Sequence, residues 1–248
     1  MINVNRGPKP KSLDRPEIKK YLDELVIYQE LSDEERKKAP KPNAGEYRES
    51  DVLVAFDRDF HSKCYLTEQK YANSWAMDVE HFKPQAIGQF PELKYEWTNL
   101  YPCSHDANIL KPKNDPIGGY LDPCSPDDDV EKEIVYVLGV AGESIFDPLK
   151  ENNLKAKNTA ELLEKVHNGN DFNSKQKTAS LRLLIAKRER EVNDLVHKWQ
   201  DKRNSLNEED ILRLKRKLKN ILSRKSDFTM LLRSLSCVKK YVPDEFLD

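Results

Sequence analysis

A glutamate directly followed by a histidine, Glu80-His81, stands near the middle of the chain and is its most chemically capable pair. Asn99, Asn108 and Lys111 follow within about the length of one small motif. Together, these residue types can build a single-metal site that hydrolyses phosphodiester bonds.

Such a reaction needs a base for water, a cation for the charge that develops on phosphorus, and help for the leaving oxygen. His81 can be the base, because the ordinary pKa of imidazole lies close to neutrality. Glu80 and the side-chain oxygen of Asn108 are hard ligands, which suit Mg²⁺ or Mn²⁺. Lys111 is expected to hold a flanking phosphate.

The adjacency of Glu80 and His81 sets a geometric condition. Neighbouring residues on a regular strand point to opposite faces, so the two can share a site only at a bulge or at a strand end. Pro84 lies just beyond the pair and favours such an end.

The elements around the pair are expected to follow in the order strand, loop, strand, helix. Tyr95 to Thr98 reads as the returning strand, which Pro102 would end. Ser104 is a plausible N-cap of a short helix that carries Asn108.

On that helix Asn108 and Lys111 are three residues apart and share a face, before Pro112 ends the turn. His105 and Asp106 are expected to point away from Asn108, toward solvent.

These residues resemble a known motif. The stretch Asp-Val-Glu-His-Phe-Lys-Pro over residues 78–84, followed by Asn99-Leu100 and Asn108, is similar to the HNH, or ββα-metal, nuclease motif. The resemblance implies that His81 is the general base, that Glu80 and Asn108 bind the metal, and that Asn99 braces the loop.

The resemblance extends, more weakly, over most of the chain. Lys-Cys-Tyr-Leu at 63–66, Leu-Asp-Pro at 121–123 and Ala-Lys-Asn-Thr-Ala-Glu-Leu-Leu at 156–163 look like the PtuB family, the HNH component of Septu and certain retron anti-phage systems. It implies a complex with a PtuA-like ATPase and, in the retron systems, with a reverse transcriptase–ncDNA complex.

One feature departs from that pattern. Many such proteins hold a structural zinc with two Cys-x-x-Cys pairs, which would fall at Cys64 with Thr67 and at Ser104 with Ala107. Three of these four positions lack a thiolate, so no structural zinc is expected and Cys64 is a remnant. An irregular site built from Cys64, Cys103 and His105 is the less favoured alternative.

Packing is expected to replace that zinc. The aromatic residues proposed to fill the gap are Tyr65, Trp75, Trp97 and Tyr101.

The predicted fold class is α+β, with a small ββα-metal core embedded in a mainly helical protein. Residues 1–46 are predicted to wrap onto the body, with a helix from Pro16. Residues 47–150 form the nuclease core and a small extra sheet around Ile134–Leu138, and residues 151–248 form a helical region that binds a partner or nucleic acid. Further helices are predicted at 47–60, around 162–166, and at 181–199, 211–222 and 228–238, with a capping box from Ser205 to Glu208.

Composition supports a helix-rich protein with a solvated surface, because 34% of residues are charged and 38% are hydrophobic. No apolar run approaches a membrane span, and the first residues lack the apolar core of a signal peptide, so a cytoplasmic protein is expected. The four cysteines are too few and scattered for a disulfide framework.

Charge is unevenly distributed despite a net charge of −1. Residues 114–151 hold ten acids and two bases, whereas residues 174–225 hold seven acids and sixteen bases. The basic segment can track nucleic acid, meet an acidic partner or simply be an exposed helical face, and the sequence leaves these open.

Two classes of function therefore remain. The first is a metal-dependent endonuclease that cuts nucleic acid, with DNA favoured and RNA such as tRNA as the alternative, because a one-metal site does not inspect the 2′-hydroxyl. The second is a catalytically silent adaptor that binds the ATPase through its C-terminal helices.

Overall fold

The computed structural model describes residues 1–139, 142–202 and 207–248 and has an α+β fold, as predicted. The α-helices are α1 (Pro16–Glu30), α2 (Asp33–Arg36), α3 (Ser50–Phe60), α4 (His105–Leu110), α5 (Val130–Glu133), α6 (Leu154–Asn168), α7 (Phe172–Lys177), α8 (Ala179–Lys202), α9 (Glu208–Ile221), α10 (Thr229–Ser234) and α11 (Ser236–Tyr241). The strands are β1 (Asp78–His81), β2 (Leu100–Cys103), β3 (Ile134–Leu138) and β4 (Ser144–Pro148).

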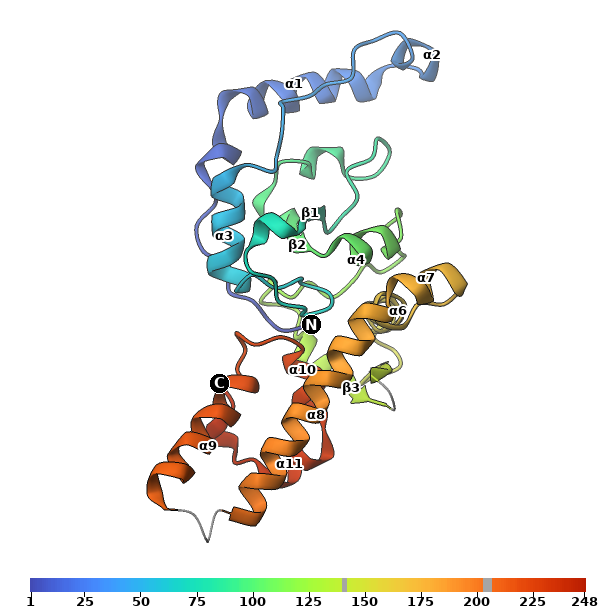
Figure 1. Cartoon of the computed structure of the whole chain (residues 1–248). Coiled ribbons are helices and arrows are strands. Elements are labelled where there is room, and N and C mark those ends of the chain that lie inside the picture. Colours follow the sequence, from blue (N-terminus) through green and yellow to red (C-terminus); the bar gives the residue numbers. More distant parts are fainter. Residues whose placement is uncertain (140–141, 203–206) are drawn as a thin grey trace.

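The elements are spread along an elongated molecule (Figure 1). Helices α1 and α2 lie at one end, the β1–β2 ribbon lies in the middle with α3 and α4, and the α8–α9 pair extends to the other end. Within the described residues, no helix has both the length and the apolar character that crossing a bilayer requires.

The central ribbon is an antiparallel pair in which Glu80 lies opposite Tyr101 and His81 opposite Leu100. Helix α4 follows β2 after a single residue, so the chain has the expected β–β–α order. The position of the second strand was predicted wrongly. A 3₁₀ turn covers Trp97–Asn99, and the strand begins only at Leu100.

Pro102 lies inside β2 rather than ending it. The amide of Phe82 donates to the carbonyl of Asn99, and hydrogen-bonded pairs alternate along an antiparallel ladder. The pair formed by Val79 and Pro102 is therefore a non-hydrogen-bonded one, and the missing N–H of proline costs no ladder bond.

Helix α3 supports the ribbon through one apolar face, as its spacing predicted. Phe56 stacks on Trp97 with ring centroids 5.3 Å apart, and Phe60 meets Tyr101 edge-on at 5.8 Å. Arg6 closes this cluster, because its guanidinium lies over Tyr101 at 4.1 Å and donates to the carbonyls of Trp97 and Leu100. Burial of each such ring contributes roughly 1.5–3 kcal/mol.

Helix α1 packs at the far edge of the same region and forms a second, smaller apolar cluster. Ile18, Tyr21 and Leu25 are buried there with Tyr95. The hydroxyl of Tyr21 donates to the carbonyl of Pro91 at 2.6 Å. These contacts hold α1 beside the loop that leaves β1.

The second sheet, β3 with β4, packs against α6, and the strand predicted at Ile134–Leu138 is confirmed. The helix predicted over 228–238 is broken into α10 and α11 at Leu235, whose backbone is extended with ψ at 133°. The hydroxyl of Ser234 donates to the carbonyl of Leu231, which competes with continuation of the helix.

The predicted capping box at the start of α9 differs from the structure. Ser205 lies outside the described residues, and the N-cap is Asn207, whose side chain accepts from the amide of Asp210 at 2.9 Å. The cap therefore sits two residues later than expected.

Candidate active site

His81 is the last residue of β1 and is the buried imidazole of the site. Its Nε2 lies 2.9 Å from the carbonyl oxygen of Lys94. A carbonyl only accepts, so this contact places the proton on Nε2 and leaves a lone pair on Nδ1. Burial lowers the pKa of His81 to about 4, which keeps the ring neutral near pH 7.

Asn99 ties the two ends of the loop between β1 and the 3₁₀ turn. Its Oδ1 accepts from the amide of Lys83 at 2.7 Å, and its Nδ2 donates to the carbonyls of Lys83 and Leu93 at 3.0 and 3.2 Å. The second of these carbonyls belongs to Leu93, and the carbonyl of the next residue, Lys94, contacts the imidazole of His81. These bonds are the ones that a bracing role requires.

Glu80 is buried on β1 with both carboxylate oxygens engaged. Oε1 accepts from the ammonium of Lys111 at 2.5 Å, and Oε2 accepts from the hydroxyl of Tyr65 at 2.9 Å. Burial raises the pKa of Glu80, and the neighbouring ammonium and hydroxyl oppose that rise.

Lys111 differs from its expected role on a flanking phosphate. Its ammonium also donates to the carbonyls of His81 and Phe82, at 2.7 and 2.8 Å, and the side chain is only 4% exposed. Three protein oxygens therefore satisfy its three donors. Lys111 is the C-cap residue of α4 and its backbone is extended, so helical spacing could not predict the direction of its side chain.

Asn108 on α4 is held by Asp78, a residue that the sequence did not single out. The Nδ2 of Asn108 donates to Oδ2 of Asp78 at 2.9 Å. No donor among the described residues reaches Oδ1 of Asn108, so that amide oxygen remains available to a cation or to water. The only signal in the sequence was the place of Asp78 two residues before Glu80, on the same strand face.

The prediction that His105 and Asp106 face solvent is confirmed, because both are exposed, but the prediction that His105 points away from Asn108 was wrong. Its Nδ1 lies 3.0 Å from the same Oδ2 of Asp78, although the imidazole is 73% exposed. The two residues are three apart on α4 and therefore share a face.

Four of these residues line one pocket of about 370 Å³. Glu80, His81, Asn108 and Lys111 all line it, whereas Asn99 is buried behind it. His81 ends its strand, and both it and Glu80 belong to the residues that line this pocket.

The donor atoms at this pocket suit a hard cation. In the described parts of the chain, no three His, Cys, Asp or Glu side chains gather where a metal ion could be held. A carboxylate and an amide oxygen nevertheless fit Mg²⁺ or Mn²⁺, which retain several waters and take further oxygens from a phosphate. The ammonium of Lys111 already neutralises part of the charge on Glu80, which lowers the attraction for such a cation.

Cys64 and Cys103 are both buried, and the amide of Thr67 lies 3.5 Å from Sγ of Cys64. Although burial opposes it, hydrogen bonds from Cys103 and from nearby amides lower the pKa of Cys64 to about 5. His105 is turned to Asp78 instead.

The aromatic packing expected in place of zinc is formed by Tyr65, Trp97 and Tyr101, which are buried. Trp75 does not belong to it, because 47% of its surface is exposed. It lies in a short 3₁₀ turn before β1, outside the core.

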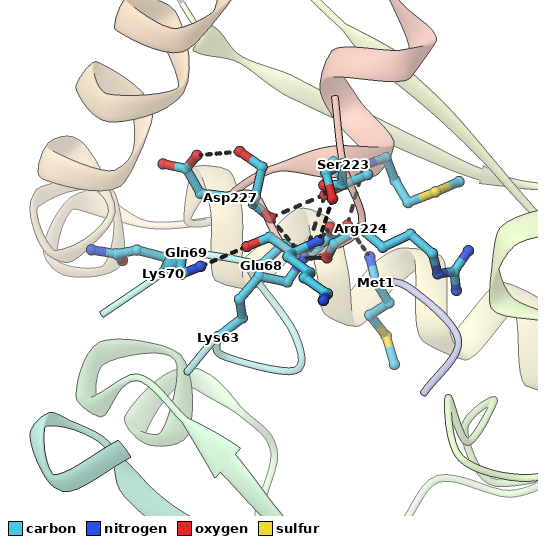
Figure 2. Close-up of polar contacts among 12 residues, drawn as sticks. Met1, Lys63, Glu68, Gln69, Lys70, Ser223, Arg224 and Asp227 are labelled. Atoms are coloured by element: carbon cyan, nitrogen blue, oxygen red, sulfur yellow. Dashed lines mark hydrogen bonds and ion pairs between the residues drawn. The ribbon is translucent and has the colours of Figure 1, made fainter. Parts of the chain in front are cut away.

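A buried ionic cluster, which the sequence did not indicate, joins this scaffold to the C-terminal region (Figure 2). Lys63 and Glu68 form an ion pair at 3.2 Å, and Lys63 also donates to the carbonyls of Arg224 and Ser226. The N-terminal ammonium of Met1 contacts Glu68 at 3.3 Å. The loop that carries Tyr65 to Glu80 is thus anchored on the segment between α9 and α10.

Some basic side chains of residues 174–225 form ion pairs and hydrogen bonds within the protein. Arg188 pairs with Glu191 and Asp227, and Arg182 donates to backbone carbonyls at the end of α6 and in α7. These side chains are therefore less available to a polyanion than the residue count suggested.

Comparisons of the chain with protein-family models, with curated proteins and with solved structures found no match.

Proposed function

We propose that this protein is a metal-dependent endonuclease of the HNH type, which hydrolyses phosphodiester bonds in nucleic acid. The observation that carries the proposal is the common pocket beside a β–β–α unit, which is lined by His81, Glu80 and Asn108. The resemblance of residues 78–84, Asn99 and Asn108 to the HNH motif supports the same conclusion.

The proposed reaction begins at His81. Its Nδ1 takes a proton from a water molecule, while the Nε2 contact with Lys94 fixes the ring and stabilises the imidazolium that forms. The water oxygen forms a bond to phosphorus as the bond from phosphorus to the leaving sugar oxygen breaks, and solvent returns a proton to that oxygen.

Glu80 and Asn108 are the side chains that would hold the cation, and Asp78 orients the amide of Asn108 for that purpose. A bound Mg²⁺ or Mn²⁺ supplies positive charge that stabilises the pentavalent phosphorus and the leaving oxygen. Asn99 keeps the loop closed so that the carbonyl of Lys94 stays in contact with His81.

The test is a cleavage assay of the purified chain on DNA and RNA with Mg²⁺ or Mn²⁺. His81→Ala should abolish cleavage without loss of fold, because His81 is the one histidine among the described residues that line the pocket. His197→Ala is the matched control, since that histidine is exposed on α8, pairs with Asp201 and does not line the pocket. Cleavage retained by His81→Ala would refute the assigned base.

One observation favours a second candidate, the catalytically silent adaptor. The carboxylate of Glu80 is already satisfied by Lys111 and Tyr65, as expected of a site that no longer binds a metal. Calorimetry with Mn²⁺ separates the two: binding that Glu80→Gln and Asn108→Ala both weaken supports the nuclease, and absence of binding supports the adaptor.

The proposal includes the partner that the resemblance implies. A PtuA-like ATPase would restrain the nuclease, with a reverse transcriptase–ncDNA complex added in a retron context. Co-expression with such an ATPase, followed by size-exclusion chromatography, tests the complex, and separate elution of the two proteins at micromolar concentration would contradict it.

A further inference from the structure

The pocket that His81 lines borders a second one. The two share three lining residues, Tyr47, Gln85 and Ala86. The second has a volume of about 340 Å³ and lies between α1 and the loop after β1, with Lys41 and Lys94 on its wall. We call the two pockets together the catalytic groove.

The charge of the catalytic groove is one-sided. Beyond the mutually neutralising pair of Glu80 and Lys111, its charged lining residues are Lys41, Lys94 and Lys113. Among the residues that the structure describes, no carboxylate lies within ion-pair distance of these three lysines. A phosphodiester strand in the catalytic groove would therefore meet positive charge from these lysines.

A larger pocket elsewhere in the described structure offers a contrast. It has about 850 Å³ and lies beside α6, where Glu143, Glu161 and Glu164 balance Lys165, Lys175 and Arg182. Its balanced charge gives it no preference for a polyanion, so volume alone does not identify the substrate path.

Tyr47 stands where the two pockets of the catalytic groove meet. Its ring lies edge-on to His81, with centroids 4.7 Å apart and planes at 75°, and the side chain is only partly buried. Pro42 and Ile87 extend the wall into the second pocket. An aromatic ring with apolar neighbours and flanking lysines is the surface that takes a nucleobase and its phosphates.

Building on the proposed function, we propose that the catalytic groove binds an unpaired nucleotide next to the scissile phosphodiester. Its base lies against Tyr47 in the second pocket, with adjoining phosphates near Lys41 and Lys113. A paired base is stacked inside its duplex and cannot enter a pocket, so the substrate is single-stranded nucleic acid or a duplex that presents an extruded nucleotide.

The first experiment measures binding without cleavage. Fluorescence anisotropy in EDTA compares a labelled single-stranded oligothymidylate with a duplex of the same length. The single strand should bind more tightly, and Tyr47→Leu should weaken its binding roughly tenfold to hundredfold. Tyr47→Phe keeps the ring and should lose less.

The salt dependence of that binding tests the lysines. Lys41→Ala and Lys113→Ala should each reduce the slope of log affinity against log salt by about 0.7, the value for one phosphate contact on a single strand. Lys150→Ala is the matched control and should leave the slope unchanged, because that exposed lysine after β4 lies outside both the groove and the basic segment 174–225. An equal loss with Lys150→Ala would overturn the assignment.

The second experiment uses the unaltered protein and therefore does not depend on the folding of a variant. With Mn²⁺, a set of single-stranded oligonucleotides carries one abasic residue that is moved stepwise along the strand. The rate of cleavage should decrease at bonds next to the abasic residue and should be unchanged at all other bonds. Uniform cleavage of all the oligonucleotides, or equal preference for duplex, overturns the groove while leaving the nuclease proposal intact.

Binding with the predicted preferences but without any cleavage would instead refute the nuclease and leave the groove standing. Absence of binding to either form in EDTA would overturn the groove.

Discussion

The Glu80–Lys111 pair allows the most direct test of how this site is stabilised. Both side chains are at most 8% exposed, and their N–O distance is 2.5 Å. Removal of one partner from a buried pair leaves a charge without compensation and costs about 3–5 kcal/mol. Lys111→Met should therefore lower the free energy of unfolding by that amount, because the carboxylate of Glu80 keeps only the hydroxyl of Tyr65.

The assay is equilibrium unfolding in urea, supported by thermal melting. For a chain of this size the loss corresponds to a fall of roughly 6–20 °C in Tm. Glu80→Gln should cost less, because the ammonium of Lys111 keeps the carbonyls of His81 and Phe82. The double variant should recover about 0.5–3 kcal/mol relative to the sum of the single changes.

The reasoning fails if Lys111→Met changes stability by less than about 1 kcal/mol, which is the range of solvent-exposed pairs. That result, together with a large loss of oligonucleotide binding, would return Lys111 to the phosphate role predicted from sequence. A large loss of stability would confirm that its ammonium is structural.

Three further outcomes follow from the contacts. Asn99→Ala should reduce cleavage by about tenfold or more and make the loop after β1 more sensitive to protease, because three hydrogen bonds are lost; unchanged proteolysis would contradict the brace. Asp78→Ala should raise the Mn²⁺ concentration needed for half-maximal activity by roughly 10- to 100-fold, since the amide of Asn108 loses its orienting partner, and an unchanged requirement would exclude that role. His167 is buried, which lowers its pKa to about 4, so its contribution to stability is complete above about pH 6.5 and is lost as the pH falls toward 4. That loss reaches about 3 kcal/mol. His167→Gln should therefore make the urea midpoint depend less steeply on pH between about 6.5 and 4. An equally steep pH dependence in the variant would assign the acid sensitivity to other groups.

Local signals determined much of the secondary structure. Apolar spacing predicted α3 and the long C-terminal helices, and β-branched residues predicted β3, because these elements depend on periodic burial along one segment. The same signals misplaced β2, since Tyr95 and Trp97 have strand-forming side chains but are buried through tertiary packing against α1 and α3.

The residue pattern alone indicated the set of reactive types, a histidine beside a carboxylate with two asparagines downstream, and the order of the elements that carry them. The tertiary structure alone decided their partners. It brought Lys111 to Glu80, Asp78 to Asn108 and the carbonyl of Lys94 to His81. Each of these contacts joins residues at least 13 positions apart in the sequence. A hydrogen bond depends on distance and direction in space, and no local pattern of residues specifies either across such separations.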